Sequence, residues 1–346
     1  MTSLVETEIR EQPEALARLL AAGRAKAEEV AGLVRARDPR YVVIAARGSS
    51  DNAARYAQYL FGAHNRLPVS LATPSLYTVY GSGPSLAGAL VIGVSQSGRS
   101  PDIVAVLEAG RRDGSLTLAI TNEPGSPLAR VADHVLPLGV GVERAVAATK
   151  TYTASLGALA LLSAALQGER ERFGELERVP ELMQAAIDAN AGLAEKVERY
   201  RYAEQLVVVG RGFNYSTAFE VALKLKETSY LVAEPYSPAD LLHGPVAMID
   251  QGFPALVIAP SGRVLADLQS FVATLEARHA EVVAISDEPE VLARARVGLP
   301  LPRSVPEWLS PMVAVVPGQL WAVALARTRG LDPDRPRGLT KVTETL

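Results

Sequence analysis

The chain has 346 residues, enough for two domains that each bury a core of their own. Hydrophobic residues make up 48% and charged residues 21% of the sequence, as in globular proteins. A net charge of −3 without a run of Lys and Arg argues against nucleic acid as a partner, and the absence of Cys excludes disulfides and a thiol nucleophile.

Targeting and metal signals are also missing from the sequence. The N-terminus lacks the basic and apolar regions of a signal peptide, and the most apolar helix candidate, 151–166, is too short to span a bilayer. We therefore expect a cytoplasmic protein with no membrane partner. No His pair or His/carboxylate cluster has ligand spacing, so neither a metal nor another cofactor is expected.

The predicted elements alternate between strands and helices. A helix over 12–37 ends at Asp38-Pro39, and a long helix over 146–167 closes the first half. The strand candidates are continuous apolar runs, as expected for parallel strands buried on both faces: 41–46, 67–72, 89–94, 116–121, 134–138, 205–209, 255–259 and 281–286. Helices are predicted between them at 52–63, 101–112, 127–133 and 216–230. This alternation predicts an α/β fold with a doubly wound parallel sheet whose site lies at the carboxyl ends of the strands.

Three segments recur at a nearly constant offset. Arg47-Gly48 recurs as Arg211-Gly212, and the run 88–98 recurs as 252–262, both 164 residues later. Residues 118–124 recur as 283–289 at an offset of 165. Matched segments in register indicate an internal duplication. We predict an N-terminal helical segment (1–38), a first domain (39–168), a helical connector (169–200), a second domain (201–330) and a tail (331–346).

The loop after the third strand candidate has the composition of an anion-binding loop. Ser95-Gln96-Ser97-Gly98 and Ser100 precede a helix that starts with Pro101-Asp102. Hydroxyls and free N–H groups at a helix start bind phosphate, and without a Gly-Lys-Ser/Thr ending a sugar monophosphate fits better than a nucleotide. An ordinary βα turn is the alternative. In the second copy the serines become Ala259-Pro260-Ser261, so only the first copy keeps the composition.

Two further segments carry ionisable groups. Glu220, Lys224 and Glu227 share one face of the helix at 216–230, either as surface salt bridges or as a polar group beside the sheet edge. His243 precedes Gly-Pro, a context in which a structural His is also common.

Only six of the 35 Lys and Arg residues are Lys. A retained Lys is therefore a candidate for a titratable amine, and Lys341 lies in a Pro-rich tail that is otherwise read as a frayed terminus. Residues 142–150 form a small-residue loop that allows close approach of a ligand or serves only the entry of the next helix.

Together these segments resemble the sugar isomerase (SIS) domain, in the tandem arrangement of the isomerase half of glucosamine-6-phosphate synthase. The fold expected from the resemblance is two tandem SIS domains, each a three-layer αβα, flavodoxin-like sheet. The matching motifs cover nearly the whole chain in family order: Arg47-Gly-Ser-Ser50, Ser95-Gln-Ser-Gly98, Val146-Ala-Ala-Thr-Lys150, Ala222–Tyr230, His243-Gly-Pro245 and Asp334–Lys341.

The resemblance implies roles for individual residues. The phosphate and the sugar hydroxyls would be bound by Ser49, Ser50, Ser95, Gln96, Ser97 and Ser100, with Val146 and Ala147 lining the sugar. Glu227 would move a proton between C1 and C2, and His243, reaching in from a neighbouring subunit of a homodimer, would assist ring opening. Lys341 would lie at the sugar carbonyl, where the synthase forms a Schiff base, and Glu220 and Lys224 would complete the polar network.

The departures from the synthase pattern bear on the reaction. The sequence has no glutaminase domain and no leading Cys, so we expect no ammonia transfer from glutamine; Arg99 replaces an acidic residue and Gly338 an Asn. The Ser-Gln-Ser-Gly-x-Ser-Pro-Asp run is similar to that of stand-alone amino-sugar phosphate deaminases. The expected reaction is therefore glucosamine 6-phosphate plus water to fructose 6-phosphate plus ammonia.

Alternative functions stay open at this point. One is a related sugar-6-phosphate isomerase, an Amadori-product deglycase, or a transaminase-like enzyme of the glutamine–fructose-6-phosphate aminotransferase family. Another is a non-catalytic sugar-phosphate sensor, although about 40 residues before the first strand leave no room for a helix-turn-helix domain. A dinucleotide-binding oxidoreductase is disfavoured because Gly48-Ser-Ser-Asp-Asn52 lacks the G-x-G-x-x-G pattern.

Overall fold

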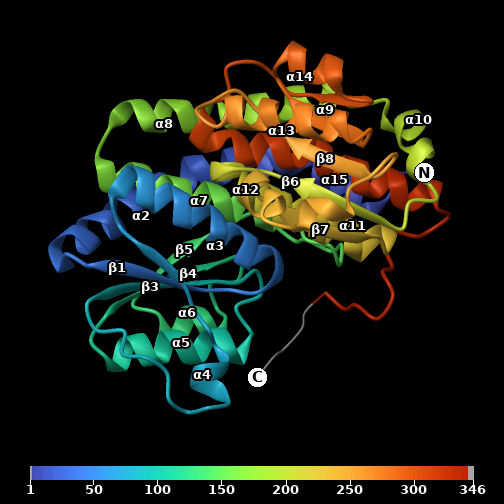
Figure 1. Cartoon of the computed structure of the whole chain (residues 1–346). Coiled ribbons are helices and arrows are strands. Elements are labelled where there is room, and N and C mark those ends of the chain that lie inside the picture. Colours follow the sequence, from blue (N-terminus) through green and yellow to red (C-terminus); the bar gives the residue numbers. More distant parts are fainter. Residues whose placement is uncertain (1, 342–346) are drawn as a thin grey trace. The chain divides into compact units, whose positions relative to one another are not determined.

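The computed structural model describes residues 2–341 and contains two modules, each built on one five-stranded sheet (Figure 1). The first module comprises residues 14–144, 150–178 and 340–341. The second module comprises residues 2–13, 145–149 and 179–339. Each is described separately below.

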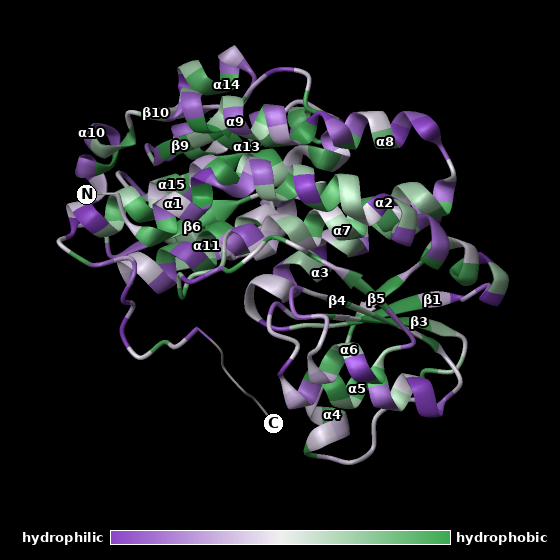
Figure 2. Ribbon diagram, turned by 180° about the vertical axis from the view of Figure 1, so that it is seen from behind, coloured by the Kyte–Doolittle hydropathy of each residue, from purple (hydrophilic) through white to green (hydrophobic). Residues whose placement is uncertain are grey.

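The sheet of the first module is parallel throughout, in the order β2-β1-β3-β4-β5. Every residue of the two strands β3 and β4 is buried, and the strands are apolar in the hydropathy colouring of Figure 2. Burial on both faces explains the continuous apolar runs of the sequence. The strands are β1 (Tyr41–Ala45), β2 (Val69–Leu71), β3 (Ala89–Val94), β4 (Leu116–Thr121) and β5 (His134–Pro137).

Helices cover both faces of this sheet. On one face, Ile103, Val106 and Leu128 pack against the alternate strand residues Val43 and Val91 in a continuous core. Helix α7, buried over nearly its whole length, packs with α3 on the other face. The helices of the module are α2 (Gln12–Arg37), α3 (Gly48–Leu60), η1 (Phe61–Asn65), α4 (Ser75–Thr78), α5 (Pro101–Arg112), α6 (Pro127–Val131), α7 (Lys150–Gln167) and α8 (Arg170–Glu177).

The second module repeats this topology. Its sheet, also parallel, has the order β10-β9-β8-β6-β7, so β6 takes the place of β1 and β8 that of β3. The strands are β6 (Gln205–Val209), β7 (Val232–Tyr236), β8 (Pro254–Ile258), β9 (Glu281–Ser286) and β10 (Val297–Pro300). The edge strands β7 and β10 were not predicted, because Pro235, Gly298 and Pro300 interrupt their β pattern; Pro is tolerated at sheet edges.

Several helices of the second module were not predicted, and the longest of them is α15. Helix α15 packs against α11 and α9 within the module. The stretch Glu307–Thr328 is long and apolar enough to cross a membrane by composition, but 94% of its most apolar window is buried in the fold, as in a core helix. The helices are α1 (Leu4–Arg10), α9 (Val179–Ala189), α10 (Leu193–Val197), η2 (Glu198–Tyr200), η3 (Gly212–Asn214), α11 (Tyr215–Ser229), α12 (Pro238–Leu242), η4 (Pro245–Met248), α13 (Leu265–Ala277), α14 (Pro289–Arg294), η5 (Glu307–Leu309) and α15 (Ser310–Thr328).

The duplication extends to backbone angles and ion pairs. Arg47 has φ −140° and ψ 154°, and its counterpart Arg211 has φ −138° and ψ 154°. Both are followed by a Gly with positive φ, and each Arg binds an Asp of a later helix of its own module. Arg47 Nε lies 2.8 Å from an Asp102 carboxylate oxygen, and Arg211 Nε lies 3.3 Å from one of Asp267. The predicted tandem α/β fold with an internal duplication is confirmed.

One predicted helix begins later than expected. The helix predicted over 146–167 begins at Lys150, as α7. The Glu143 carboxylate accepts hydrogen bonds from the Thr151 N–H, at 3.0 Å, and from the Thr151 hydroxyl, at 2.7 Å. A side chain that caps the first turn in this way fixes the helix start, so residues 145–149 remain irregular.

Candidate active site

Two helices begin at the point where the first sheet reverses its strand order. Strands β1 and β3 are neighbours, although β2 lies between them in sequence. Helix α3 starts directly after β1, and α5 starts after the loop that follows β3. In doubly wound sheets ligands bind at such a switch point, and the helix N-termini there favour an anion.

The loop from Ser95 to Ser100 is shaped by its own hydrogen bonds. The Gly98 N–H donates to Ser95 Oγ at 3.1 Å, and the Arg99 N–H donates to Ser97 Oγ at 3.4 Å. Gly98 has φ +61°, and a Cβ built on it would lie 2.1 Å from Ser126 Oγ. Both the left-handed backbone and the close approach therefore require glycine here.

The remaining predicted phosphate ligands lie at the two helix starts. Ser49 and Ser50 occupy the first turn of α3, and Ser100 is the N-cap residue of α5 without a side-chain capping bond. Burial raises the pKa of the neighbouring Asp51 carboxyl, opposed by Arg55 at 3.1 Å. The ion pair with Arg55 partly neutralises this carboxylate beside the two helix starts. We call Ser49, Ser50, Ser95, Gln96, Ser97 and Ser100 the anion cradle.

In the corresponding loop of the second module, N–H and hydroxyl groups are already hydrogen-bonded to carboxylates of the same module. Asp287 accepts hydrogen bonds from the Ser261 N–H, at 2.7 Å, and from the Ser261 hydroxyl. Glu307 accepts a hydrogen bond from the Arg263 N–H at 3.0 Å. In the first module the neutral Asn122 stands at the position of Asp287 and bonds to the loop at Val140 and Gly141. Internal carboxylates thus take N–H groups of the second-module loop that an external anion would need, so the loop of the first module is the candidate anion site.

Helix α11 of the second module carries a buried polar group. Lys224 Nζ lies 2.6 Å from a carboxylate oxygen of Glu227 and 3.5 Å from one of Glu220. The side chains of Glu220 and Lys224 are 0% and 2% exposed, whereas that of Glu227 is 21% exposed. The reading of these residues as surface salt bridges is wrong. Of these three side chains only that of Glu227 is partly exposed, and its carboxylate lies against the buried ammonium.

The structure does not place every predicted residue in this group. His243 is exposed at the C-cap of α12, and among the described residues 2–341 its imidazole makes no hydrogen bond. Val146 and Ala147 lie in the irregular segment that precedes α7, half-buried and buried respectively. Glu8 of α1 fixes this segment by accepting a hydrogen bond from the Ala145 N–H at 3.2 Å.

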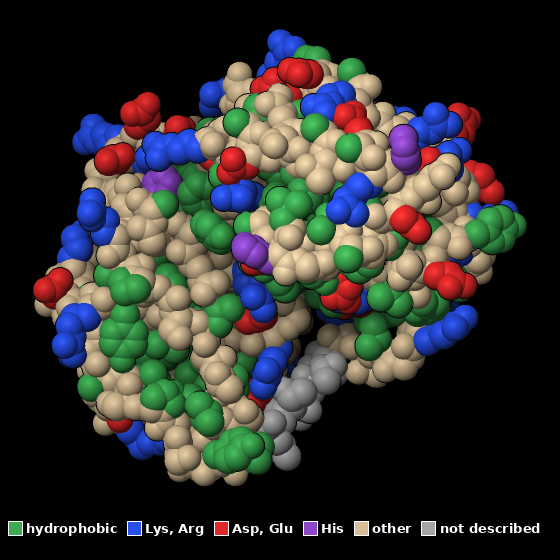
Figure 3. Space-filling view, viewed as in Figure 1, with side chains coloured by type: hydrophobic (Ala, Val, Ile, Leu, Met, Phe, Trp, Pro, Cys, Tyr) green, Lys and Arg blue, Asp and Glu red, His purple; other side chains and the backbone are tan. Residues whose placement is uncertain are grey.

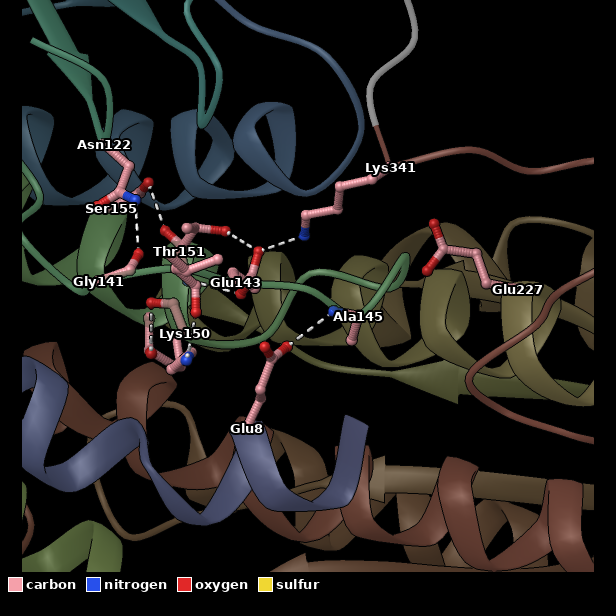
Figure 4. A network of polar contacts seen from close by, with 12 residues as sticks. Glu8, Asn122, Gly141, Glu143, Ala145, Lys150, Thr151, Ser155, Glu227 and Lys341 are labelled. Atoms are coloured by element: carbon pink, nitrogen blue, oxygen red, sulfur yellow. Dashed lines mark hydrogen bonds and ion pairs between the residues drawn. The ribbon is translucent and has the colours of Figure 1, made fainter. Parts of the chain in front are cut away.

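The C-terminal tail is anchored at several points along its described part. The Asp334 carboxylate accepts hydrogen bonds from the N–H groups of Leu4 and Val5 at the start of α1. Arg337 donates its backbone N–H to the Tyr230 hydroxyl and lies over the Tyr230 ring. Lys341 Nζ lies 2.7 Å from a carboxylate oxygen of Glu143 (Figure 4). The reading of the tail as a frayed terminus is therefore wrong as far as Lys341; residues 342–346 lie outside the described part.

Sequence reasoning missed two buried carboxylates, Asp102 and Glu143. The sequence indicates Asp102 only as a helix-start residue, yet its side chain is fully buried and binds Arg47. The sequence could have indicated this ion pair, because both Arg47 and Asp102 have counterparts in the duplicated copy, Arg211 and Asp267. Glu143 had no such signal, since its partners are a helix start and a residue 198 positions away in sequence.

The charged side chains of the described residues 2–341 neither separate by sign on the face shown in Figure 3 nor form a metal-ligand cluster. Side chains of both charge signs are interspersed over the face shown in Figure 3, so no field of one sign is presented there. Within residues 2–341 no group of three His, Asp or Glu side chains is placed to hold a metal ion.

Comparison with known proteins shows the family. The SIS domain model matches residues 37–165 and 200–327, one segment for each sheet, and the chain belongs to the SIS domain family. The chain is homologous to the isomerase domain of glutamine–fructose-6-phosphate aminotransferase. It is 40% identical to the enzyme of Thermococcus kodakarensis over 261 residues, 73% of this chain and 43% of that protein. It is 34% identical to that of Pyrococcus horikoshii over 339 residues, 96% of this chain and 56% of that protein. The chain thus spans about half the length of these curated relatives.

Solved structures agree with this assignment. A putative phosphosugar isomerase from Silicibacter pomeroyi superposes with a TM-score of 0.88 at 38% identity, covering 96% of this chain and all of that one. The C-terminal domain of the aminotransferase from Francisella tularensis superposes with a TM-score of 0.88 at 27% identity, over 97% of this chain and 99% of that one. A glucosamine-6-phosphate deaminase from Thermotoga maritima shares the fold, with a TM-score of 0.81 at 22% identity over 99% of this chain and all of that one.

Proposed function

We propose that this protein is an amino-sugar phosphate deaminase and isomerase that converts glucosamine 6-phosphate and water to fructose 6-phosphate and ammonia. The observation that carries the proposal is the partly exposed Glu227 side chain, whose carboxylate is held by the buried Lys224, in a chain that also has a candidate anion cradle. An aldose–ketose shift needs a carboxylate that takes a proton from C2 and returns it to C1. The family membership and the resemblance to stand-alone deaminases support the choice of substrate.

The proposed roles follow the order of the reaction. The anion cradle binds the 6-phosphate, Val146 and Ala147 line the sugar, and His243 assists opening of the ring. Glu227 then moves the proton between C2 and C1, with Glu220 and Lys224 holding its carboxylate. Lys341 lies at the sugar carbonyl, either as an amine that forms a Schiff base with it or as an ammonium that stabilises the developing enolate oxygen.

Ammonia release across a panel of sugar 6-phosphates tests the proposal. We expect the highest kcat/KM on glucosamine 6-phosphate, with fructose 6-phosphate formed in equal amount to ammonia. A higher kcat/KM on galactosamine 6-phosphate or on a fructosamine 6-phosphate would show that the proposed substrate is wrong, while the proposed type of reaction would stand. Phosphate-dependent binding without turnover of any member would establish a sensor instead.

The cradle serines will dominate substrate affinity. Replacing Ser95 and Ser97 together by Ala removes two hydroxyl donors to a dianion, each worth about 1.5–3 kcal/mol. We expect a rise in KM of at least roughly 100-fold and loss of the thermal protection that glucose 6-phosphate gives the wild type. Ser261→Ala is the matched control, because this hydroxyl binds Asp287 in the second module. Unchanged protection in the double variant would place the phosphate elsewhere.

A homodimer with shared sites is the proposed active form. The resemblance brings His243 from a neighbouring subunit, and the exposed imidazole of His243 is compatible with a role outside its own chain. Mixing inactive Glu227→Gln chains with inactive His243→Ala chains will restore part of the activity, because hybrid sites contain both residues. If activity stays absent after subunit exchange has been confirmed by mass spectrometry, the two residues act from the same chain.

A further inference from the structure

We infer that Glu143 is a positioning residue that holds the ammonium of Lys341. The inference rests on the proposed function of Lys341, and it concerns a residue to which neither the motifs nor the family resemblance gave a role. Glu143 lies in the irregular segment before α7, and both it and Lys341 belong to the first module.

The contacts of Glu143 divide between its two carboxylate oxygens. Oε1 accepts the Thr151 N–H at 3.0 Å. Oε2 accepts the Thr151 hydroxyl at 2.7 Å and lies 2.7 Å from Lys341 Nζ (Figure 4). The Glu143 side chain is fully buried, whereas that of Lys341 is 23% exposed. A buried carboxylate with a fixed backbone partner is a rigid acceptor, so it orients the long and otherwise flexible Lys side chain.

The need for such a holder follows from the tail itself. Residues 337–340 are exposed, and their described backbone contacts anchor the chain at Arg337 rather than at Lys341. A Lys side chain carries about 2 kcal/mol of rotamer entropy. Without the ion pair, Nζ would sample many positions, and a group misplaced by about 1 Å can cost 100-fold in rate.

Glu143→Gln separates this role from helix capping. The Gln keeps an oxygen to accept the Thr151 N–H, and the Thr151 hydroxyl can turn to accept from the new amide. Only the charge facing Lys341 is lost. We expect kcat to fall at least tenfold while KM stays within about twofold, because the cradle is untouched. Glu143→Asp, which keeps the charge on a shorter side chain, should give an intermediate kcat.

A double-mutant cycle tests whether Glu143 acts through Lys341. If it does, Glu143→Gln with Lys341→Arg will be no slower than the slower single variant, within about twofold. If instead the double variant lost kcat by the product of the two single reductions, the two residues would act independently and the inference would be overturned. Asp133→Asn is the matched control, since Asp133 accepts the N–H and the hydroxyl of Thr117 without any Lys and should leave kcat unchanged.

Chemical labelling provides a readout that needs no turnover. The chain has six Lys residues, so competitive acetylation can be followed at each of them by peptide mass spectrometry. In Glu143→Gln we expect Lys341 to react at least threefold faster relative to the exposed Lys196, and in Asp133→Asn at the wild-type ratio. An unchanged ratio in both Glu143 variants would overturn the inference. A wild type inactive on every sugar phosphate, with the labelling change present, would overturn the proposed function and keep the ion pair.

Discussion

Glu227→Gln will lower kcat roughly 100- to 10,000-fold, the range that general acid–base catalysis contributes. Gln keeps the volume and can still accept the hydrogen bond from Lys224, so the helix and its buried neighbours lose no packing. It cannot accept a proton at neutral pH. KM and the thermal protection by glucose 6-phosphate should stay near wild type, because the cradle lies in other elements.

Hydrogen exchange with solvent shows whether the lower kcat is caused by loss of proton transfer or by a general loss of activity. In D₂O the wild type will exchange the C1 hydrogen of fructose 6-phosphate, as followed by NMR, and Glu227→Gln will lose that exchange in proportion to kcat. Glu234→Gln, on the exposed side of β7, is the matched control and should retain both. Wild-type exchange in Glu227→Gln would assign the proton transfer to another base, with His243 the next candidate.

The prediction of the fold was most accurate where burial alone determines the pattern. Strands β3, β4, β6 and β9 have the predicted bounds, because continuous apolar runs with polar ends leave little choice. The edge strands β7 and β10 and the buried helix α15 were missed. Their residues include Pro and Gly, and the pairing that stabilises them comes from distant segments rather than from local propensity.

In the candidate site, too, features of the local sequence could be predicted and features that depend on tertiary contacts could not. The position of Ser95, Gln96, Ser97 and Ser100 between a strand and a helix start could be predicted, because these residues lie close together in one loop; their binding of phosphate remains a prediction. The burial of Glu220 and Lys224 could not, since spacing along a helix gives a shared face but not what covers it. Glu143 was out of reach for a further reason: its partners Thr151 and Lys341 come together only in the folded chain.

The buried ammonium of Lys224 leads to the second large effect. Lys224→Met keeps much of the side-chain volume but leaves the fully buried Glu220 carboxylate without the ammonium at 3.5 Å and Glu227 without the one at 2.6 Å. Removing one partner of a buried ion pair costs about 3–5 kcal/mol, because the remaining charge stays desolvated. We expect a loss of this size in the free energy of unfolding, measured with urea, together with loss of turnover.

Two companion variants identify the cause of that loss. Lys226→Met makes the same substitution two residues further along α11 at an exposed position, and should change stability by less than about 0.5 kcal/mol. Lys224→Met combined with Glu220→Gln also removes the fully buried charge that has lost the Lys224 ammonium, and should recover part of the stability. It should not recover turnover, since Glu227 would still lack the ammonium that holds its carboxylate. Full recovery of turnover in that double variant would show that Lys224 serves only to neutralise Glu220, and that the orientation of Glu227 has another source.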